Sequence, residues 1–433
     1  MKFDRSLWLA GAATFALLPV LAAPAFAGPR PVGPEFRVNL TSEFKQLNPQ
    51  AAYNNAGQAL VVWENPQHGI RGIYYNSNGQ PVGAEMSLVP NQTLGAIPAR
   101  GDVVSRKEPA LALLPNGEFF LFWTEERAFL SVDYFIEDRD IHDRDILGQR
   151  FSPLGTPVGE RFKVNTTDVG FQAAPKAIVR NGGDMIVIWG SDDRQRGIGE
   201  GDGFYAQIVS RAGRLLGNEI KIATLRDAAI KAISLAADAQ GDFIVTWESC
   251  CLDGDNLGVV ARLYDKTGAP RGGEFVVNTD RVGRQRRPAV AADRSGKGFL
   301  VTWQGFVESP VELQSRIFGQ FVGSAGNLVG PQFKISTGTF EDVQISPSVA
   351  LLPSGNFLVT WMSWIKSSPI GVLGVEVDAT GNLVGREFAV STGKIYPQYR
   401  TALAVSKSGE AFSAWQAADG RRKMSIVGRR LDD

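Results

Sequence analysis

Seven tryptophans recur along the chain at intervals of 54 to 66 residues, and this period constrains the fold more than any other feature. They are Trp63, Trp123, Trp189, Trp247, Trp303, Trp361 and Trp415. A fixed period of this length is typical of architectures built by repeating one supersecondary unit. The fold prediction therefore begins with the sequence around each tryptophan.

Each of these tryptophans ends a short apolar segment whose side chains alternate between two faces, as in residues 357–361 (Phe-Leu-Val-Thr-Trp). Such alternation predicts a β-strand. A second apolar strand precedes it, and two more follow, with glycine turns between them. Four short strands per repeat are typical of one propeller blade, so the sequence predicts an all-β, seven-bladed β-propeller with four-stranded blades.

Two further residues keep a fixed distance from the tryptophan. A proline precedes it by fourteen residues in four repeats and by fifteen in a fifth, at Pro49, Pro109, Pro175, Pro347 and Pro288. A glutamine stands three residues before this position in five repeats, at Gln46, Gln172, Gln285, Gln344 and Gln398. Repetition around a ring predicts that the glutamine makes a structural hydrogen bond between blades, the alternative being a polar ring at the channel mouth.

The two ends of the repeat array complement each other. The last repeat ends at its third strand, residues 426–431, and has no fourth. Residues 35–39 (Glu-Phe-Arg-Val-Asn) match the fourth strand of other repeats, such as 274–278 (Glu-Phe-Val-Val-Asn). We therefore expect the N-terminal strand to complete the last blade, which closes the ring and removes free sheet edges. Residues 28–433 are predicted to form one propeller.

The first 27 residues have the pattern of a signal peptide. Lys2 and Arg5 precede an apolar run over residues 7–23, and Ala25-Phe26-Ala27 supplies small residues for cleavage after Ala27. The alternative is a retained membrane anchor. We expect a mature protein in the periplasm, or secreted to the medium or the cell surface, with no membrane span after cleavage.

Composition excludes some functions. The chain carries 45 basic and 45 acidic side chains, so it lacks the basic excess that a nucleic-acid binder uses to release phosphate counterions. Two histidines and two cysteines argue against a histidine-rich zinc or copper centre. No Ser-His-Asp arrangement or cofactor fingerprint is present, and we assign no catalytic residue and no certain cofactor. The balance favours a binding protein over an enzyme.

Three repeated motifs resemble those of a known group of proteins. They are Gly-x-Phe-x-Val-Thr-Trp (355–361), Gly-Gln-Arg-Phe (148–151) and Gly-x-x-Phe-x-Val-Asn (159–165). They resemble the tryptophan-containing repeat arrays of secreted and cell-surface bacterial proteins, some of which have Ca²⁺-binding tracts. The resemblance covers nearly the whole mature chain. It implies an extracellular location and a binding or surface role, and it supplies no assigned catalytic residues.

Ligand-binding residues are expected on the loops that differ among repeats, since functional side chains concentrate on variable loops of a rigid scaffold. The longest such loop spans residues 124–145. Aromatic and basic side chains there and in other variable loops could recognise an anionic polysaccharide, the alternative being a solvated charged rim. The candidates are Tyr134, Phe135, His142, Arg284, Arg286, Trp364, Tyr396 and Tyr399.

Two more local features invite a functional interpretation. Carboxylates that could bind Ca²⁺ stand in two loops, at Asp138, Asp140, Asp143, Asp145, Asp253 and Asp255, although none follows the EF-hand pattern. The alternative is a salt-bridged loop. Cys250 and Cys251 are adjacent. In an oxidising compartment they could form a vicinal disulfide or an intermolecular bridge, or remain free thiols.

The sequence thus predicts an exported, non-catalytic propeller that recognises a carbohydrate, peptide or protein ligand on its variable-loop face. One alternative is a polysaccharide lyase or hydrolase with its site on the loops of blades one to three, where His68, His142, Tyr134 and Arg144 would be available. The other alternative is a structural subunit of a cell-surface assembly.

Overall fold

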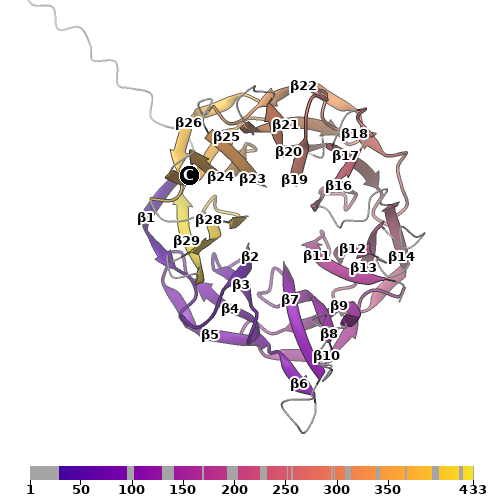
Figure 1. The fold of residues 1–433 in the computed structure, drawn as a ribbon, viewed down its shortest axis with the longest axis vertical. Coiled ribbons are helices and arrows are strands. Elements are labelled where there is room, and N and C mark those ends of the chain that lie inside the picture. Colours follow the sequence, from indigo (N-terminus) through magenta and orange to yellow (C-terminus); the bar gives the residue numbers. More distant parts are fainter. Residues whose placement is uncertain are drawn as a thin grey trace, which may run out of the picture.

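The structure is a computed structural model, and its strands form a ring around a central opening (Figure 1). It describes residues 29–432 apart from fourteen short gaps. The gaps are 95–101, 129–140, 168–169, 193–202, 225–231, 251, 255–256, 294–295, 297, 308–313, 338–341, 366–367, 393–398 and 419–422, with 1–28 and 433 also outside the described part. The described residues form strands and turns and no helix, so the prediction of an all-β propeller is confirmed.

The strands follow the tryptophan repeat in groups of four. The Trp63 group holds β2 (Leu47–Tyr53), β3 (Ala59–Asn65), β4 (Gly69–Tyr75) and β5 (Pro81–Val89). The Trp123 group holds β7 (Asp102–Leu113), β8 (Phe119–Ala128), β9 (Ile141–Phe151) and β10 (Pro157–Lys163), with β6 (Gln92–Leu94) beside β7. The Trp189 group holds β11 (Phe171–Val179), β12 (Met185–Asp192), β13 (Gly203–Val209) and β14 (Leu215–Thr224).

The remaining groups repeat this plan. The Trp247 group holds β15 (Ile233–Ala237), β16 (Phe243–Cys250), β17 (Leu257–Tyr264) and β18 (Phe275–Val276). The Trp303 group holds β19 (Gln285–Ala292), β20 (Gly298–Val307), β21 (Gln314–Gly323) and β22 (Leu328–Lys334). The Trp361 group holds β23 (Asp342–Leu351), β24 (Phe357–Ile365), β25 (Ser368–Val377) and β26 (Leu383–Ala389). The Trp415 group holds β27 (Tyr399–Val405), β28 (Ala411–Ala418), β29 (Met424–Asp432) and β1 (Arg30–Arg37).

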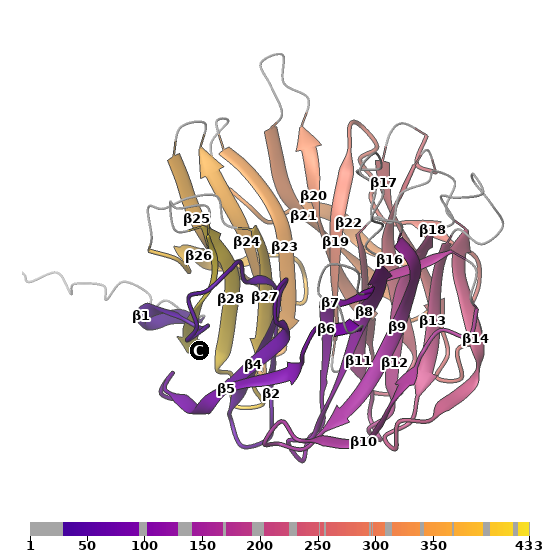
Figure 2. The same ribbon diagram turned by 60° about the horizontal axis from the view of Figure 1, so that its bottom comes forward.

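Within each group neighbouring strands pair antiparallel, and the first strand lies innermost (Figure 1). Figure 2 turns the ring to show inner strands such as β7, β19 and β23 running roughly along its axis. Hydrogen bonding joins the described strands into six sheets rather than the expected seven separate ones. The cause is one parallel pairing between Ser315 of β21 and Val343 of β23, which merges two neighbouring groups into an eight-stranded sheet.

The ring is closed by strands from the two ends of the chain. β1 pairs antiparallel with β29, with Phe36 opposite Gly428. Beyond β1 the backbone nitrogen of Val38 donates to the carbonyl oxygen of Ile426 at 2.8 Å, and the Ile426 nitrogen donates to Asn39 Oδ1 at 2.8 Å. The N-terminal segment thus completes the Trp415 group as the sequence predicts, although the pairing begins at Arg30, five residues earlier than expected.

The core lies between neighbouring groups. The seven repeat tryptophans have 0–2% of their surface exposed. Each packs against the preceding group, as Trp189 does against Phe120 and Phe122, and as Trp63 does against Phe412 across the junction of the two chain ends. Burial of large aromatic side chains is a dominant stabilising term in such a core. Continuous packing around the whole ring follows from this repeated contact.

The repeated glutamines bind the tryptophans. Trp63 Nε1 donates to Gln46 Oε1 at 2.7 Å, and Trp189 Nε1 donates to Gln172 Oε1 at 2.8 Å. The prediction of a structural hydrogen bond is confirmed at these positions, but its placement between blades is wrong. Both partners belong to one group, because the glutamine lies at the start of the inner strand beside the end of the tryptophan strand.

The described part of the chain contains no helical segment with the length and hydropathy that crossing a membrane requires.

Candidate ligand-binding cavity

A cavity of about 910 Å³ lies on the axis of the ring, lined by the inner strands of every group. Its walls come from the first residues of these strands and the last residues of the tryptophan strands. It therefore lies at the end of the channel where the connections between groups meet those between second and third strands. The volume falls within the range of about 300–1,000 Å³ that is usual for small-molecule sites.

A β-bulge shapes the wall of this cavity in most groups. In β11 two residues, Ala174 and Pro175, stand opposite the single residue Trp189. The same arrangement sets Asn48-Pro49 opposite Trp63, and the corresponding pairs Glu108-Pro109, Arg287-Pro288 and Ser346-Pro347 opposite their own tryptophans. Proline cannot donate a hydrogen bond to the ladder and is therefore confined to edges and bulges. The repeated proline marks the bulge.

The residue before each of these prolines adopts a left-handed backbone conformation. The φ angles are +53° at Asn48, +54° at Glu108, +56° at Ala174, +53° at Arg287 and +54° at Ser346, and Arg400 has +47° at the equivalent place in β27. A non-glycine residue there costs about 1–3 kcal/mol, and such strain clusters at ligand sites. All six of these residues line the cavity.

Neighbouring groups hold this strained backbone in place. The backbone nitrogen of Glu108 donates to Glu64 Oε2 at 2.9 Å, and that of Arg287 donates to Glu248 Oε1 at 2.6 Å. Glu64 and Glu248 each follow the tryptophan of the preceding group. In the same way the Asn48 nitrogen donates to Gln416 Oε1 at 3.2 Å. We call this contact the bulge latch. It satisfies a backbone donor that the bulge removes from the ladder.

The cavity lining is predominantly cationic. Among the described residues it contains five basic side chains, Arg144, Lys176, Arg286, Arg287 and Arg400, and one carboxylate, Glu108. Two of the five have acidic partners outside the lining: Arg144 pairs with Glu126 at 2.8 Å, and Arg286 with Glu248 at 3.5 Å. The other three leave the cavity with an excess of positive charge.

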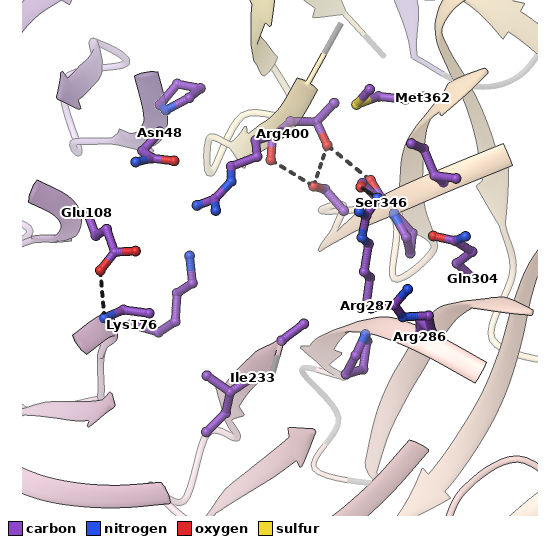
Figure 3. A pocket seen from close by; sticks show the side chains of 18 of the residues that line it. Asn48, Glu108, Lys176, Ile233, Arg286, Arg287, Gln304, Ser346, Met362 and Arg400 are labelled. Atoms are coloured by element: carbon purple, nitrogen blue, oxygen red, sulfur yellow. Dashed lines mark hydrogen bonds between the residues drawn. The ribbon is translucent and has the colours of Figure 1, made fainter. Parts of the chain in front are cut away.

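Lys176 and Arg400 extend into the open centre of the cavity from different inner strands (Figure 3). Burial holds the pKa of the Lys176 ammonium below its ordinary value of 10.5; Arg400 lowers it further, and Glu108 opposes the shift. Burial also lowers the pKa of Arg287, with repulsion from Arg286 and Arg400 partly offset by Glu248. Cations that destabilise one another in this way favour an anionic ligand.

Glu108 is only partly available to a ligand. Its Oε2 atom accepts hydrogen bonds from the Ala174 nitrogen at 2.9 Å and from Thr124 Oγ1 at 3.0 Å. One carboxylate oxygen therefore holds the neighbouring bulge. The lining also contains Trp364 and Phe306, which give one side of the cavity an aromatic surface.

The structure places the predicted ligand residues in different surroundings. Arg286 and Trp364 line the cavity, whereas Arg284 is exposed outside the lining. Tyr134, Phe135 and Tyr396 lie outside the described residues, as do the side chains of His142 and Tyr399. His68, named for the lyase alternative, is exposed, and its ring packs edge-on against Phe44 with 5.3 Å between centroids. Arg144 of that alternative does line the cavity.

The predicted Ca²⁺ ligands are only partly described. Asp138, Asp140 and Asp255 and the side chain of Asp143 lie outside the described residues. Asp145 pairs with Lys163 at 2.7 Å, and Asp253 is fully buried and accepts a hydrogen bond of 3.1 Å from Asn278 Nδ2. Among the side chains that the structure describes, no three acidic, histidine or cysteine residues cluster as a metal site would require. A Ca²⁺ site in these loops stays a prediction.

The principal cavity residues were missed because they lie on inner strands rather than on variable loops. Lys176, Arg287 and Arg400 occupy the first strands of their groups. One signal was present in the sequence: in the five groups that have the repeated proline, the residue before it is different each time. Variation at one fixed position of a repeat points to a recognition surface.

No protein-family model and no curated protein sequence matches this chain. Solved structures with a similar fold include an intramolecular trans-sialidase from Ruminococcus gnavus in complex with oseltamivir carboxylate, with a TM-score of 0.50 and 8% identity over 79% of this chain and 97% of that one. A protein of unknown function from Dyadobacter fermentans has a TM-score of 0.49 and 12% identity over the same shares. At these identities the likeness shows the propeller fold alone.

Proposed function

We propose that this protein binds an acidic carbohydrate in the axial cavity and does not convert it chemically. The observation that carries the proposal is the convergence of Lys176, Arg287 and Arg400 on a lining that offers one carboxylate. Guanidinium groups match carboxylates in geometry and charge. A sugar acid also supplies hydroxyl groups for the polar walls and an apolar ring face for Trp364.

A non-catalytic role has its own support. Glycoside hydrolysis in most families uses two carboxylates placed across the scissile bond. The described lining offers Glu108, one oxygen of which already accepts two hydrogen bonds. The trans-sialidase neighbour was solved with a ligand named as a carboxylate, which is a property of that protein; the charge of this cavity gives an independent reason to expect one here.

Calorimetric titration with short polyuronate oligosaccharides tests the proposal, with neutral oligosaccharides of equal length as the comparison. We expect binding of the acidic ligands only, weakened by added salt. Lys176→Met and Arg287→Met should each weaken it, while Arg281→Met, which removes an exposed arginine outside the lining, should not. Equal binding of neutral and acidic ligands would contradict the proposal. Release of unsaturated uronate during incubation would favour the lyase alternative, and binding only to peptides would favour a protein partner.

We further infer that the ring has seven blades and that the eight-stranded sheet is two of them. Each half of that sheet contains its own four consecutive antiparallel strands and its own buried tryptophan, Trp303 or Trp361. One residue pairing joins the halves, between Ser315 and Val343. An experimental structure tests this count: it should show seven radial four-stranded blades, with the Ser315–Val343 contact at the junction of two of them.

We also propose that the protein is exported and that its two cysteines form a vicinal disulfide. The proposed signal peptide, residues 1–27, lies outside the described part. N-terminal sequencing of protein recovered outside the cytoplasm tests this proposal. Cys250 and Cys251 are adjacent and are the chain's two cysteines, which supports the proposed vicinal bridge. An intact monomer mass that does not rise by two hydrogens on reduction would contradict that bridge.

A further inference from the structure

We propose that the six residues at the bulge position, together with Ala232 at the corresponding place of the Trp247 group, form a recognition ring that binds a sugar acid in one fixed orientation. The ring comprises Asn48, Glu108, Ala174, Ala232, Arg287, Ser346 and Arg400. The anionic group of the bound sugar acid faces the arc of Arg287, Ser346 and Arg400. The hydroxyl groups of the ligand face Asn48 and Glu108, and its apolar part faces Ala174 and Ala232. The inference rests on the proposed function and specifies how that site selects its ligand.

The backbone makes six of these seven positions equivalent while their side chains vary. These six have left-handed φ values between +47° and +56°. Ala232 holds the corresponding sequence position before β15, in a group without the bulge, because Ile233 pairs directly with Trp247. Bulge latches from the preceding group hold the backbone nitrogens of Asn48, Glu108 and Arg287. The fold therefore fixes where each side chain begins and leaves its chemistry free to vary. A scaffold of this kind separates recognition from folding.

Consecutive groups supply the cationic arc. Arg287 Nη1 donates to Ser346 Oγ at 2.8 Å, so the first two positions of the arc are already connected. Arg400 has no hydrogen bond or ion pair to another described residue, and Figure 3 shows its guanidinium directed into the cavity. Burial lowers the pKa of Arg287, and repulsion by Arg286 and Arg400 lowers it further. A carboxylate between Arg287 and Arg400 would relieve the repulsion between these two guanidinium groups.

The next arc presents hydrogen-bond acceptors. Asn48 Nδ2 donates to Glu64 Oε2 at 2.7 Å, which leaves its Oδ1 atom without a hydrogen bond from another described residue. Glu108 uses Oε2 for the Ala174 nitrogen and Thr124, and its Oε1 atom likewise accepts no hydrogen bond from a described residue. Two acceptor oxygens attract hydroxyl donors and repel a carboxylate. This arc therefore excludes the reversed orientation.

The third arc is small and apolar. Ala174 and Ala232 are followed by Pro175 and Ile233, which also line the cavity. No described side chain at these two ring positions extends beyond a methyl group, so the arc offers space beside the polar arcs. The apolar face of a sugar ring, or the methyl group of an acetyl substituent, would bury apolar surface away from water there.

Four variants test the ring with a uronate disaccharide and its carboxyl-reduced, neutral analogue as probes. Wild type should prefer the acidic probe. Arg400→Asn should reduce affinity for the acidic probe by about tenfold or more and leave the neutral probe unchanged, because the lost interaction is with the carboxylate. Asparagine tolerates left-handed φ, so the melting temperature should not fall. Glu108→Gln keeps an acceptor for the Ala174 nitrogen. It should weaken the binding of both probes similarly and so retain the preference for the acidic one.

Two controls separate recognition from backbone effects. Phe44 also has a left-handed φ, +63°, but lies outside the lining, and Phe44→Asn should leave both affinities unchanged. Arg281→Met removes an exposed arginine outside the lining and should preserve the preference for the acidic probe. If wild type binds neither probe, the proposed function and the ring both fail. If wild type and Arg281→Met prefer the acidic probe and Arg400→Asn does so equally, the ring fails and the proposed function stands.

Discussion

Glu64 Oε2 accepts a hydrogen bond of 2.9 Å from the backbone nitrogen of Glu108, and this contact joins two neighbouring groups at the wall of the cavity. The same carboxylate oxygen accepts the Asn48 side-chain amide at 2.7 Å, so one buried residue fixes two positions of the recognition ring. Equivalent bulge latches at Glu248 and Gln416 show that the contact is part of the repeat rather than a local accident.

Removing the Glu64 side chain should destabilise the fold. Glu64→Ala leaves the Glu108 nitrogen and the Asn48 amide without their acceptor in a buried place, which costs about 1–3 kcal/mol per group. Glu64→Gln keeps a carbonyl oxygen in the latch, as Gln416 does naturally. Urea unfolding at neutral pH should therefore rank Glu64→Ala clearly below Glu64→Gln. Equal stability of the two variants would contradict the structural role of the latch.

The stability difference between wild type and Glu64→Gln should depend on pH. Burial raises the pKa of Glu64 above its ordinary value of 4.5, against opposing hydrogen bonds from Glu108 and Asn48. The folded state therefore holds this proton to higher pH than the unfolded state, so the stabilisation is full below 4.5 and is lost as pH rises through the folded-state pKa. Glu64→Gln does not titrate, and unfolding series across this range should show its relative stability rising with pH.

Strain at the bulge should respond to glycine. Ala174 has φ of +56°, and Ala174→Gly relieves a left-handed conformation that costs an alanine about 1–2 kcal/mol. We expect this variant to be as stable as wild type or more stable. The matched control is Ala112→Gly in β7, a buried residue of ordinary strand conformation, which should be destabilised. A loss of stability at Ala174 as large as that at Ala112 would argue against strain.

The indole hydrogen bond can be isolated by comparing two tryptophans. Trp189 Nε1 donates to Gln172 at 2.8 Å, whereas Trp123 Nε1, where Arg106 replaces the glutamine, has no partner among the described residues. Both side chains are buried. Trp189→Phe should therefore cost about 1–3 kcal/mol more than Trp123→Phe, since it also leaves Gln172 unsatisfied. The midpoints of denaturant unfolding, for variants whose m-values are equal, measure this difference in the free energy of unfolding.

Sequence reasoning recovered what the repeat encodes locally. The tryptophan period, the alternating strands and the matching chain ends are patterns along the sequence itself, and each places strands correctly. The cavity was not recovered, because it depends on which residues of distant groups face one axis. Lys176 and Arg400 meet only after the ring closes. The repeated proline within a strand was the overlooked local clue, since it marks the bulge that turns the preceding residue toward the channel.

Ring closure should dominate the stability of the whole protein. A variant lacking residues 29–39 loses β1, the buried Val38 and the acceptor of the Ile426 nitrogen at once. The Trp415 group then has a free outer edge on β29. We expect a large fall in melting temperature and a tendency to associate through that edge. An unchanged melting temperature would mean that interblade packing alone closes the ring.

Lys176 should make ligand binding depend on pH. Its pKa is lowered from 10.5 by burial and by Arg400, so the folded protein loses this proton at lower pH than the unfolded chain does. Between the two pKa values the unfolded state binds more protons, and the stability of the fold should rise with pH through that interval.

A bound carboxylate favours the charged ammonium of Lys176 and raises its pKa, so affinity for a uronate should fall as pH rises through the pKa of the free protein. Titration in buffers of different ionisation enthalpy should reveal proton uptake on binding in wild type. Lys176→Met should bind more weakly and without this proton uptake; persistence of the uptake in that variant would assign it to another group.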